Sequence, residues 1–191
     1  MNLFVGSHLA ISSELRAERK LLAEREFASQ KVKLRGYSSV RALGRYEGGL
    51  KDIVLALKAG NTRMAKPLAK LLVELVDLTE TVDLVTWVPA SKAGFRSRGF
   101  DQSQLLAKHL SKRLGVKCSR TVRRIDNYSQ HDLSRAGRGI GPSFRLLRPI
   151  QGRVLVVDDV ITTGMTLERY RRLLDPQNQS ILSAVCLASA N

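Results

Sequence analysis

The segment from Arg153 to Thr166, RVLVVDDVITTGMT, constrains the fold of this chain more than any other stretch. Its first half, Val154 to Val157, is a continuous apolar run, which is typical of a strand covered on both faces. The acid pair Asp158–Asp159 follows where this strand is expected to end, and the spacing beyond it predicts a helix over 167–174. This order of elements predicts an α/β protein whose mainly parallel sheet is flanked by helices.

The loop between this strand and this helix has the composition of an anion-binding site. Its residues are Ile161, Thr162, Thr163, Gly164, Met165 and Thr166. Backbone N–H groups and hydroxyls at a helix N-terminus favour an anion, and Gly164 allows a close approach or a positive φ. Asp158 and Asp159 can accept hydrogen bonds from hydroxyls or hold a hydrated cation. A phosphoribosyl ligand with magnesium nearby satisfies all of these groups, and the alternative is an ordinary turn with exposed acids.

A second strand–loop–helix unit precedes the first in the chain. Residues 84–88 are expected to form a buried strand, and Asp101 with Gln104 resembles a capping box for the helix that follows. A basic loop between a strand end and a helix start is a candidate anion site, and the alternative is an ordinary surface loop. The candidate residues of this loop are Ala90, Ser91, Lys92, Arg96 and Arg98.

The net charge of +15 is concentrated in the middle of the chain. Residues 92–148 contain 14 Lys or Arg residues against three Asp residues, which is a net charge of +11. Such a concentration indicates an anionic partner, either pyrophosphate or nucleic acid, and the alternative is a solvated basic surface. The stretch over 123–148 lacks periodicity and is expected to be a long, basic flap over the phosphate site. Its candidate contacts are Arg123, Arg124, Gln130 and Arg138.

The run from Asp158 to Thr166, DDVITTGMT, resembles the loop with which type I phosphoribosyltransferases bind 5-phosphoribosyl 1-diphosphate (PRPP). The resemblance implies that Asp158 and Asp159 contact the ribose hydroxyls and that residues 161–166 hold the 5′-phosphate. It also implies that magnesium enters with PRPP and not through a set of side-chain ligands. In this frame, the basic loop after residue 89 is expected to contact the pyrophosphate.

The motif RGFDQ over 98–102, combined with DDVITTGMT, is similar to the ComF family of competence proteins and GntX-like relatives. The resemblance extends from about residue 44 to the end of the chain. It implies a phosphoribosyltransferase fold and a link to DNA uptake or natural transformation. The chain departs from the family in two places. No cysteine precedes Cys118, where family members commonly carry a four-cysteine zinc module, and Pro142-Ser143 replaces Gly-Ala beside the flap.

The remaining elements are less informative. Strands are expected over 37–46, 116–122 and 181–187. Residues 1–36 are expected to form a helical appendage without the zinc module, with a helix over 12–30, and residues 37–191 to form the phosphoribosyltransferase-like domain. No apolar run is long enough to span a membrane, and the cysteines are isolated, so a cytoplasmic protein is expected.

Three functions remain open at the level of the sequence. The first is a phosphoribosyltransferase, that is, a pentosyl glycosyltransferase that expels pyrophosphate, with nucleobase salvage as one form of it. The second is a sensor that binds PRPP or a nucleotide without transferring the ribosyl group. The third is a module that binds single-stranded DNA through the basic segment. The partners to be expected are a phosphoribosyl ligand, single-stranded DNA, a protein of the competence machinery, or a second copy of the chain in a homodimer.

Overall fold

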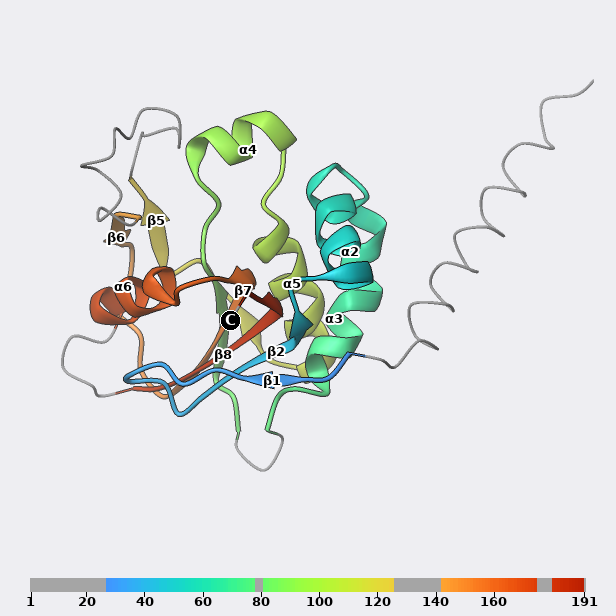
Figure 1. Ribbon diagram of the computed structural model, residues 1–191. Coiled ribbons are helices and arrows are strands. Elements are labelled where there is room, and N and C mark those ends of the chain that lie inside the picture. The colour runs from blue at the N-terminus through green and yellow to red at the C-terminus, as the bar shows by residue number, and fades with distance from the viewer. Residues whose placement is uncertain (1–26, 78–80, 126–141, 175–179, 191) are drawn as a thin grey trace, which may run out of the picture.

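The computed structural model describes residues 27–77, 81–125, 142–174 and 180–190. A six-stranded sheet has the order β1-β2-β8-β7-β3-β4, and β5 and β6 form a separate two-stranded sheet (Figure 1). The strands are β1 (Gln30–Lys31), β2 (Ser39–Arg45), β3 (Leu84–Trp87), β4 (Lys117–Cys118), β5 (Val122–Arg124), β6 (Phe144–Leu146), β7 (Arg153–Ile161) and β8 (Ile181–Ser189). The helices are α2 (Gly48–Lys58), α3 (Ala65–Val73), α4 (Lys92–Arg98), α5 (Gln102–Leu114) and α6 (Met165–Leu174), with a 3₁₀ turn η1 (Thr62–Met64) before α3.

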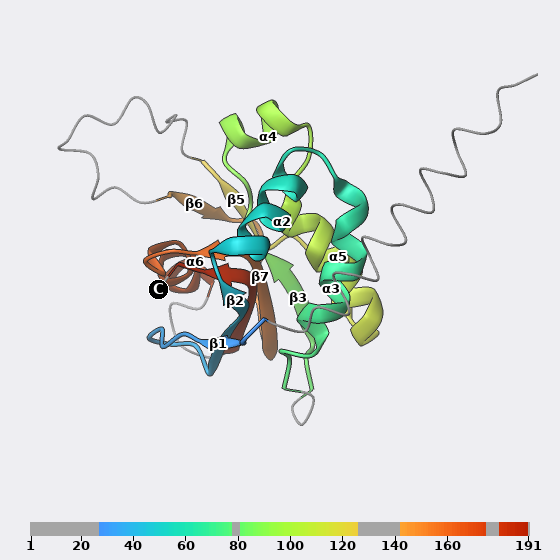
Figure 2. The ribbon, with the colours of Figure 1, turned by 45° about the vertical axis from the view of Figure 1, so that its right-hand side comes forward.

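The larger sheet is parallel from β2 to β4, and β1 pairs antiparallel with β2. Helices cover both of its faces (Figures 1 and 2). One core packs α2, α3 and α5 against the sheet, where Leu57 and Leu106 belong to the same cluster as Val157. The other core packs α6 on the opposite face, where Tyr170 belongs to the same cluster as Val156. The apolar run of β7 alternates between these two cores, and the expected mainly parallel sheet flanked by helices is confirmed.

β7 is longer than expected. The strand was predicted to end at Val157, but it continues to Ile161 because β8 runs beside it over the same length. Asp158 pairs with Cys186 and Ile161 pairs with Ser189. The acid pair therefore lies within the strand and not in the loop after it.

Residues 27–36 belong to the sheet domain. Gln30 lies in β1, opposite Ala42 of β2, and Leu34 packs against the α6 core. The expected helix over 12–30 and the expected boundary at residue 37 are therefore wrong for residues 27–36. The rest of the expected appendage, residues 1–26, lies outside the described residues.

The expected strand over 116–122 is confirmed only for Lys117–Cys118, because the chain leaves the main sheet after β4. Ser119 still bonds to β3 through its backbone, and the chain then turns into β5, which pairs antiparallel with β6. The β5–β6 hairpin lies between α4 and α6 in both views (Figures 1 and 2). In the part of the chain that the structure describes, no helix is both long and apolar enough to cross a membrane.

Candidate functional site

The acid pair is buried at the carboxyl-terminal end of the central strand. Asp158 is 7% exposed and Asp159 is 8% exposed. The backbone N–H of Asp159 donates to Oδ1 of Asp158 at 2.9 Å, and the two carboxyl groups are close enough to interact electrostatically. Burial raises the pKa of Asp158 well above its usual value, and the neighbouring Asp159 charge raises it further. A ligand that donates hydrogen bonds or positive charge would relieve this cost.

Three further side chains contact the acid pair. Lys58, at the end of α2, places Nζ 2.9 Å from Oδ2 of Asp159. Gln102 donates from Nε2 to the same oxygen at 2.8 Å, and the Ser103 hydroxyl donates to Oδ1 of Asp158 at 3.4 Å. Gln102 lies within the RGFDQ motif that the sequence analysis identified. The contacts of Lys58 and Ser103 with the acid pair depend on how the helices pack on the sheet.

The loop after β7 adopts the turn that its glycine predicts. Gly164 has φ +75°, so the expected positive φ is confirmed. A Cβ at Gly164 would also collide with the Leu34 side chain, so this position has little room for any other residue. Thr162 and Thr163 are exposed, and α6 begins at Met165 directly after them.

A cavity of about 600 Å³, the acid-pair cavity, joins these elements. Its lining includes Lys58, Ser91, Arg98, Gln102, Asp158, Asp159 and Thr166. Within the described residues, two buried side-chain atoms of this lining, Oε1 of Gln102 and Nε of Arg98, have no hydrogen-bond partner. Such atoms are rare in folded proteins, so they indicate a partner that the described residues do not supply.

The segment predicted as a basic loop forms a short helix instead. Ser91 caps α4 by accepting a hydrogen bond from the Gly94 N–H at 3.0 Å, and Gly99 ends the helix with φ +76°. The helix divides the candidate residues between two cavities, because a helix presents its side chains in several directions. Ser91 and Arg98 line the acid-pair cavity, whereas Lys92 and Arg96 line another one.

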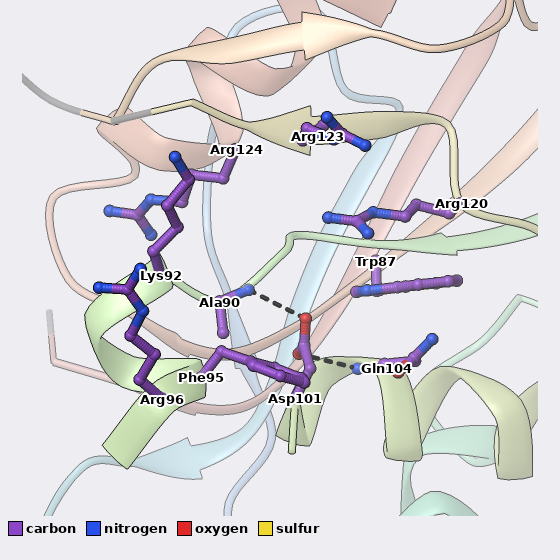
Figure 3. Close-up of a pocket in the computed structure, with 10 residues that line it drawn as sticks. All are labelled: Trp87, Ala90, Lys92, Phe95, Arg96, Asp101, Gln104, Arg120, Arg123 and Arg124. Atoms are coloured by element: carbon purple, nitrogen blue, oxygen red, sulfur yellow. Dashed lines mark hydrogen bonds between the residues drawn. The ribbon is translucent and has the colours of Figure 1, made fainter. Parts of the chain in front are cut away.

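The second cavity, the basic cavity, has a volume of about 320 Å³ (Figure 3). It is lined by Trp87, Ala90, Lys92, Phe95, Arg96, Asp101, Gln104, Arg120, Arg123 and Arg124. The two flap candidates Arg123 and Arg124 therefore lie at this cavity, and Arg124 lines the acid-pair cavity as well. The other two, Gln130 and Arg138, lie outside the described residues.

Asp101 stands in the wall of the basic cavity and joins two elements there. Its Oδ1 accepts from the Gln104 N–H at 3.2 Å, which confirms the expected cap of α5. Its Oδ2 accepts from the Ala90 N–H at 3.0 Å and so holds the segment after β3 against α5 (Figure 3). Burial raises the pKa of Asp101, and these two backbone hydrogen bonds oppose the rise.

Comparison with known proteins finds relatives by sequence. Residues 101–191 match the model of the phosphoribosyl transferase domain. The DNA utilization protein YhgH of Salmonella typhimurium is 33% identical over 137 residues, which cover 66% of this chain and 60% of the relative. YhgH of Escherichia coli is 34% identical over 110 residues, which cover 55% of this chain and 48% of the relative. The chain thus spans about half to three-fifths of the length of these relatives.

The solved structures that match the chain include adenine phosphoribosyltransferases. The enzyme of Trypanosoma brucei, in complex with AMP, pyrophosphate and ribose-5-phosphate, is 14% identical with a TM-score of 0.48, and the match covers 84% of this chain and 74% of that one. The enzyme of Thermoanaerobacter pseudethanolicus is 17% identical with a TM-score of 0.44, over 68% of this chain and 82% of that one. The sequence matches agree with the resemblance drawn from RGFDQ and DDVITTGMT. Residues 101–191 are similar to the phosphoribosyl transferase domain, and about two thirds of the chain is similar to the DNA utilization protein YhgH, which is consistent with a ComF-like protein.

Proposed function

We propose that the acid-pair cavity binds the phosphoribosyl group of PRPP or of a nucleoside 5′-phosphate. The observation that carries this proposal is the pair of unpartnered buried atoms, Oε1 of Gln102 and Nε of Arg98, beside the buried acid pair. Oε1 is an acceptor and Nε is a donor, so together they suit a ligand that has both hydroxyls and anionic oxygens. A phosphorylated ribose has both.

Each part of such a ligand has a counterpart in the cavity. The ribose diol would donate to Asp158 and Asp159 in competition with Lys58 and Gln102. The 5′-phosphate would lie at residues 161–166, where α6 begins and the helix dipole favours an anion. The pyrophosphate would face Ser91 and Arg98, which line the same cavity.

In this proposal, magnesium would enter the site together with the ligand. Among the described residues, no group of three or more His, Cys, Asp or Glu side chains could hold a metal ion. Oδ2 of Asp159 already accepts from Lys58 and Gln102. Magnesium is commonly held by one or two carboxylates together with substrate phosphates, and Asp158 could supply one carboxylate. Bound in this way, the ion would neutralise charge on the pyrophosphate.

The reaction that such binding supports is phosphoribosyl transfer. A nucleophile would attack the anomeric carbon, the bond from that carbon to pyrophosphate oxygen would break, and the electron pair would leave with pyrophosphate. The part of this chain would be to orient the ribose through the acid pair and to stabilise the departing charge with Arg98. A sensor would use the same cavity without transfer, and pyrophosphate release from PRPP in the presence of a panel of bases distinguishes the two.

The biological setting that we propose is the handling of DNA during uptake. Its support is the description of the relatives as DNA utilization proteins, together with the net charge of +11 over residues 92–148. A cytoplasmic location and a partner in the competence machinery belong to the same proposal.

Calorimetric titration with PRPP and magnesium tests the binding site. Replacing Asp158 and Asp159 by Asn removes acceptors for ribose hydroxyls, so the affinity should fall by about tenfold or more, the equivalent of one hydrogen bond to a charged group. Asp52→Asn is the matched control, because Asp52 is an exposed carboxylate on α2 that does not line the cavity. Unchanged affinity in a folded double variant would remove the assignment of the ribose to the acid pair.

A further inference from the structure

The basic cavity is lined by an excess of positively charged side chains, and the acid pair is not part of its lining. Five of its ten lining side chains are Lys or Arg, and Asp101 is the single carboxylate among those ten. Both oxygens of Asp101 already accept backbone N–H groups, so this carboxylate serves the backbone of the wall. Within the described residues, no hydrogen bond or ion pair is found for the guanidinium groups of Arg96 and Arg123. A cavity with this charge attracts an anion.

Arg120 is held in place at the wall of this cavity. Its Nε donates to the Val122 carbonyl at 3.1 Å, and no described residue is seen to occupy its other guanidinium N–H groups, which can donate to a ligand. Figure 3 shows Arg120 and Arg123 on one side of the cavity, with Phe95 and Asp101 on the opposite side. A phosphate between these two sides would meet guanidinium groups, which bind phosphate through paired N–H donors.

The same cavity also has an aromatic wall. The phenyl ring of Phe95 on α4 is 49% exposed, which is high for a large apolar side chain. The buried Trp87 indole lines the same cavity. Exposed aromatic rings beside arginines form stacking surfaces for planar ligands such as nucleobases. A pyrophosphate or a sugar phosphate would leave this wall without a partner.

From these observations, we infer that the basic cavity is a second binding site, separate from the acid-pair cavity, and that it takes a nucleoside 5′-phosphate. The phosphate meets Arg96, Arg120 and Arg123, and the base lies against Phe95. A volume of about 320 Å³ is at the lower end for ligand pockets and suits one nucleotide. The two cavities share Ala90 and Arg124 in their linings, so a ligand in one changes the surroundings of the other. This site does not depend on PRPP binding at the acid pair.

Tryptophan fluorescence tests the inference, because Trp87 is the one tryptophan of the chain and lies in the wall of this cavity. Titration with AMP should change the emission in a saturable way, and adenosine or inorganic phosphate should each bind at least about tenfold more weakly. The Asp158→Asn/Asp159→Asn variant should keep the AMP response. Loss of the response in that variant, or phosphate binding as tightly as AMP, would overturn the inference.

Two variants with matched controls separate the contributions of the ring and of the charges. Phe95→Ala should weaken AMP binding by about tenfold, whereas Leu55→Ala, which also removes an exposed hydrophobic side chain, should leave it unchanged. Arg96→Gln with Arg123→Gln should weaken it further and make it less sensitive to salt. Lys112→Gln with Arg113→Gln removes the same charge from the exposed end of α5 and should have little effect. Equal losses in the test and control variants would show that no defined site exists here.

Because AMP could also enter the acid-pair cavity, the two sites are compared within the double Asn variant. If PRPP binding at the acid pair fails but AMP still changes the Trp87 emission, the basic cavity stands alone. If PRPP binds and AMP does not reach Trp87, the inference is wrong and the proposed function is unaffected.

Discussion

At Gly164, both the backbone conformation and a neighbouring side chain disfavour any residue with a Cβ. Its φ is +75°, and a Cβ there would collide with Leu34. Gly115 has a similar φ of +69°, but no atom lies within 4 Å of its Cβ position. The two glycines therefore separate backbone strain from steric crowding.

Gly115→Ala should lower the free energy of unfolding by about 1–2 kcal/mol, the cost of left-handed backbone for a residue with a Cβ. Gly164→Ala should cost about 1–3 kcal/mol more, because the Leu34 side chain must also move. Unfolding in urea measures both changes. In a Leu34→Ala background, Gly164→Ala should lower the free energy of unfolding by less than it does in the unchanged chain. Equal losses at the two glycines would show that Leu34 does not restrict the loop.

At the scale of elements, Asp101 joins the segment after β3 to the start of α5. Asp101→Ala removes the helix cap and the bond to the Ala90 N–H, so it should cost about 2 kcal/mol, roughly 1 kcal/mol from each. Asp101→Ser should restore most of the capping part. Ser91→Ala removes the cap of α4 alone and should cost about 1 kcal/mol. Urea unfolding gives these values, and a loss for Asp101→Ala no larger than that for Ser91→Ala would show that the bond to Ala90 contributes nothing.

At the scale of the whole molecule, the uneven charge predicts salt-dependent binding of nucleic acid. The affinity for a single-stranded oligonucleotide should fall as salt rises, with a slope of about −0.7 per phosphate contact on logarithmic axes. Arg96→Gln with Arg123→Gln should make the slope shallower by about 1.4, whereas Lys112→Gln with Arg113→Gln should change it less. Fluorescence anisotropy at several salt concentrations measures the slopes. No binding even at low salt would remove the role in DNA binding and leave the small-ligand sites.

Local patterns were sufficient for much of the fold and for part of the site. The apolar run before Asp158 predicted a strand covered on both faces, because only such a strand has no polar face. Asp101 and Gln104 predicted a helix start, and Gly164 predicted a positive φ, since capping and left-handed backbone depend on residues close in sequence. The acid pair and the loop after it were identified for the same reason.

The remaining features depend on contacts between distant segments, which no local pattern records. β7 runs on through the acid pair because β8 pairs with it, and residues 27–36 join the sheet because β2 offers a free edge. Lys58 and Gln102 reach Asp159 only because two helices pack on the same face of the sheet. Composition predicted an anion site in a basic loop. Tertiary packing decided that this segment is a helix whose cationic side chains line two cavities.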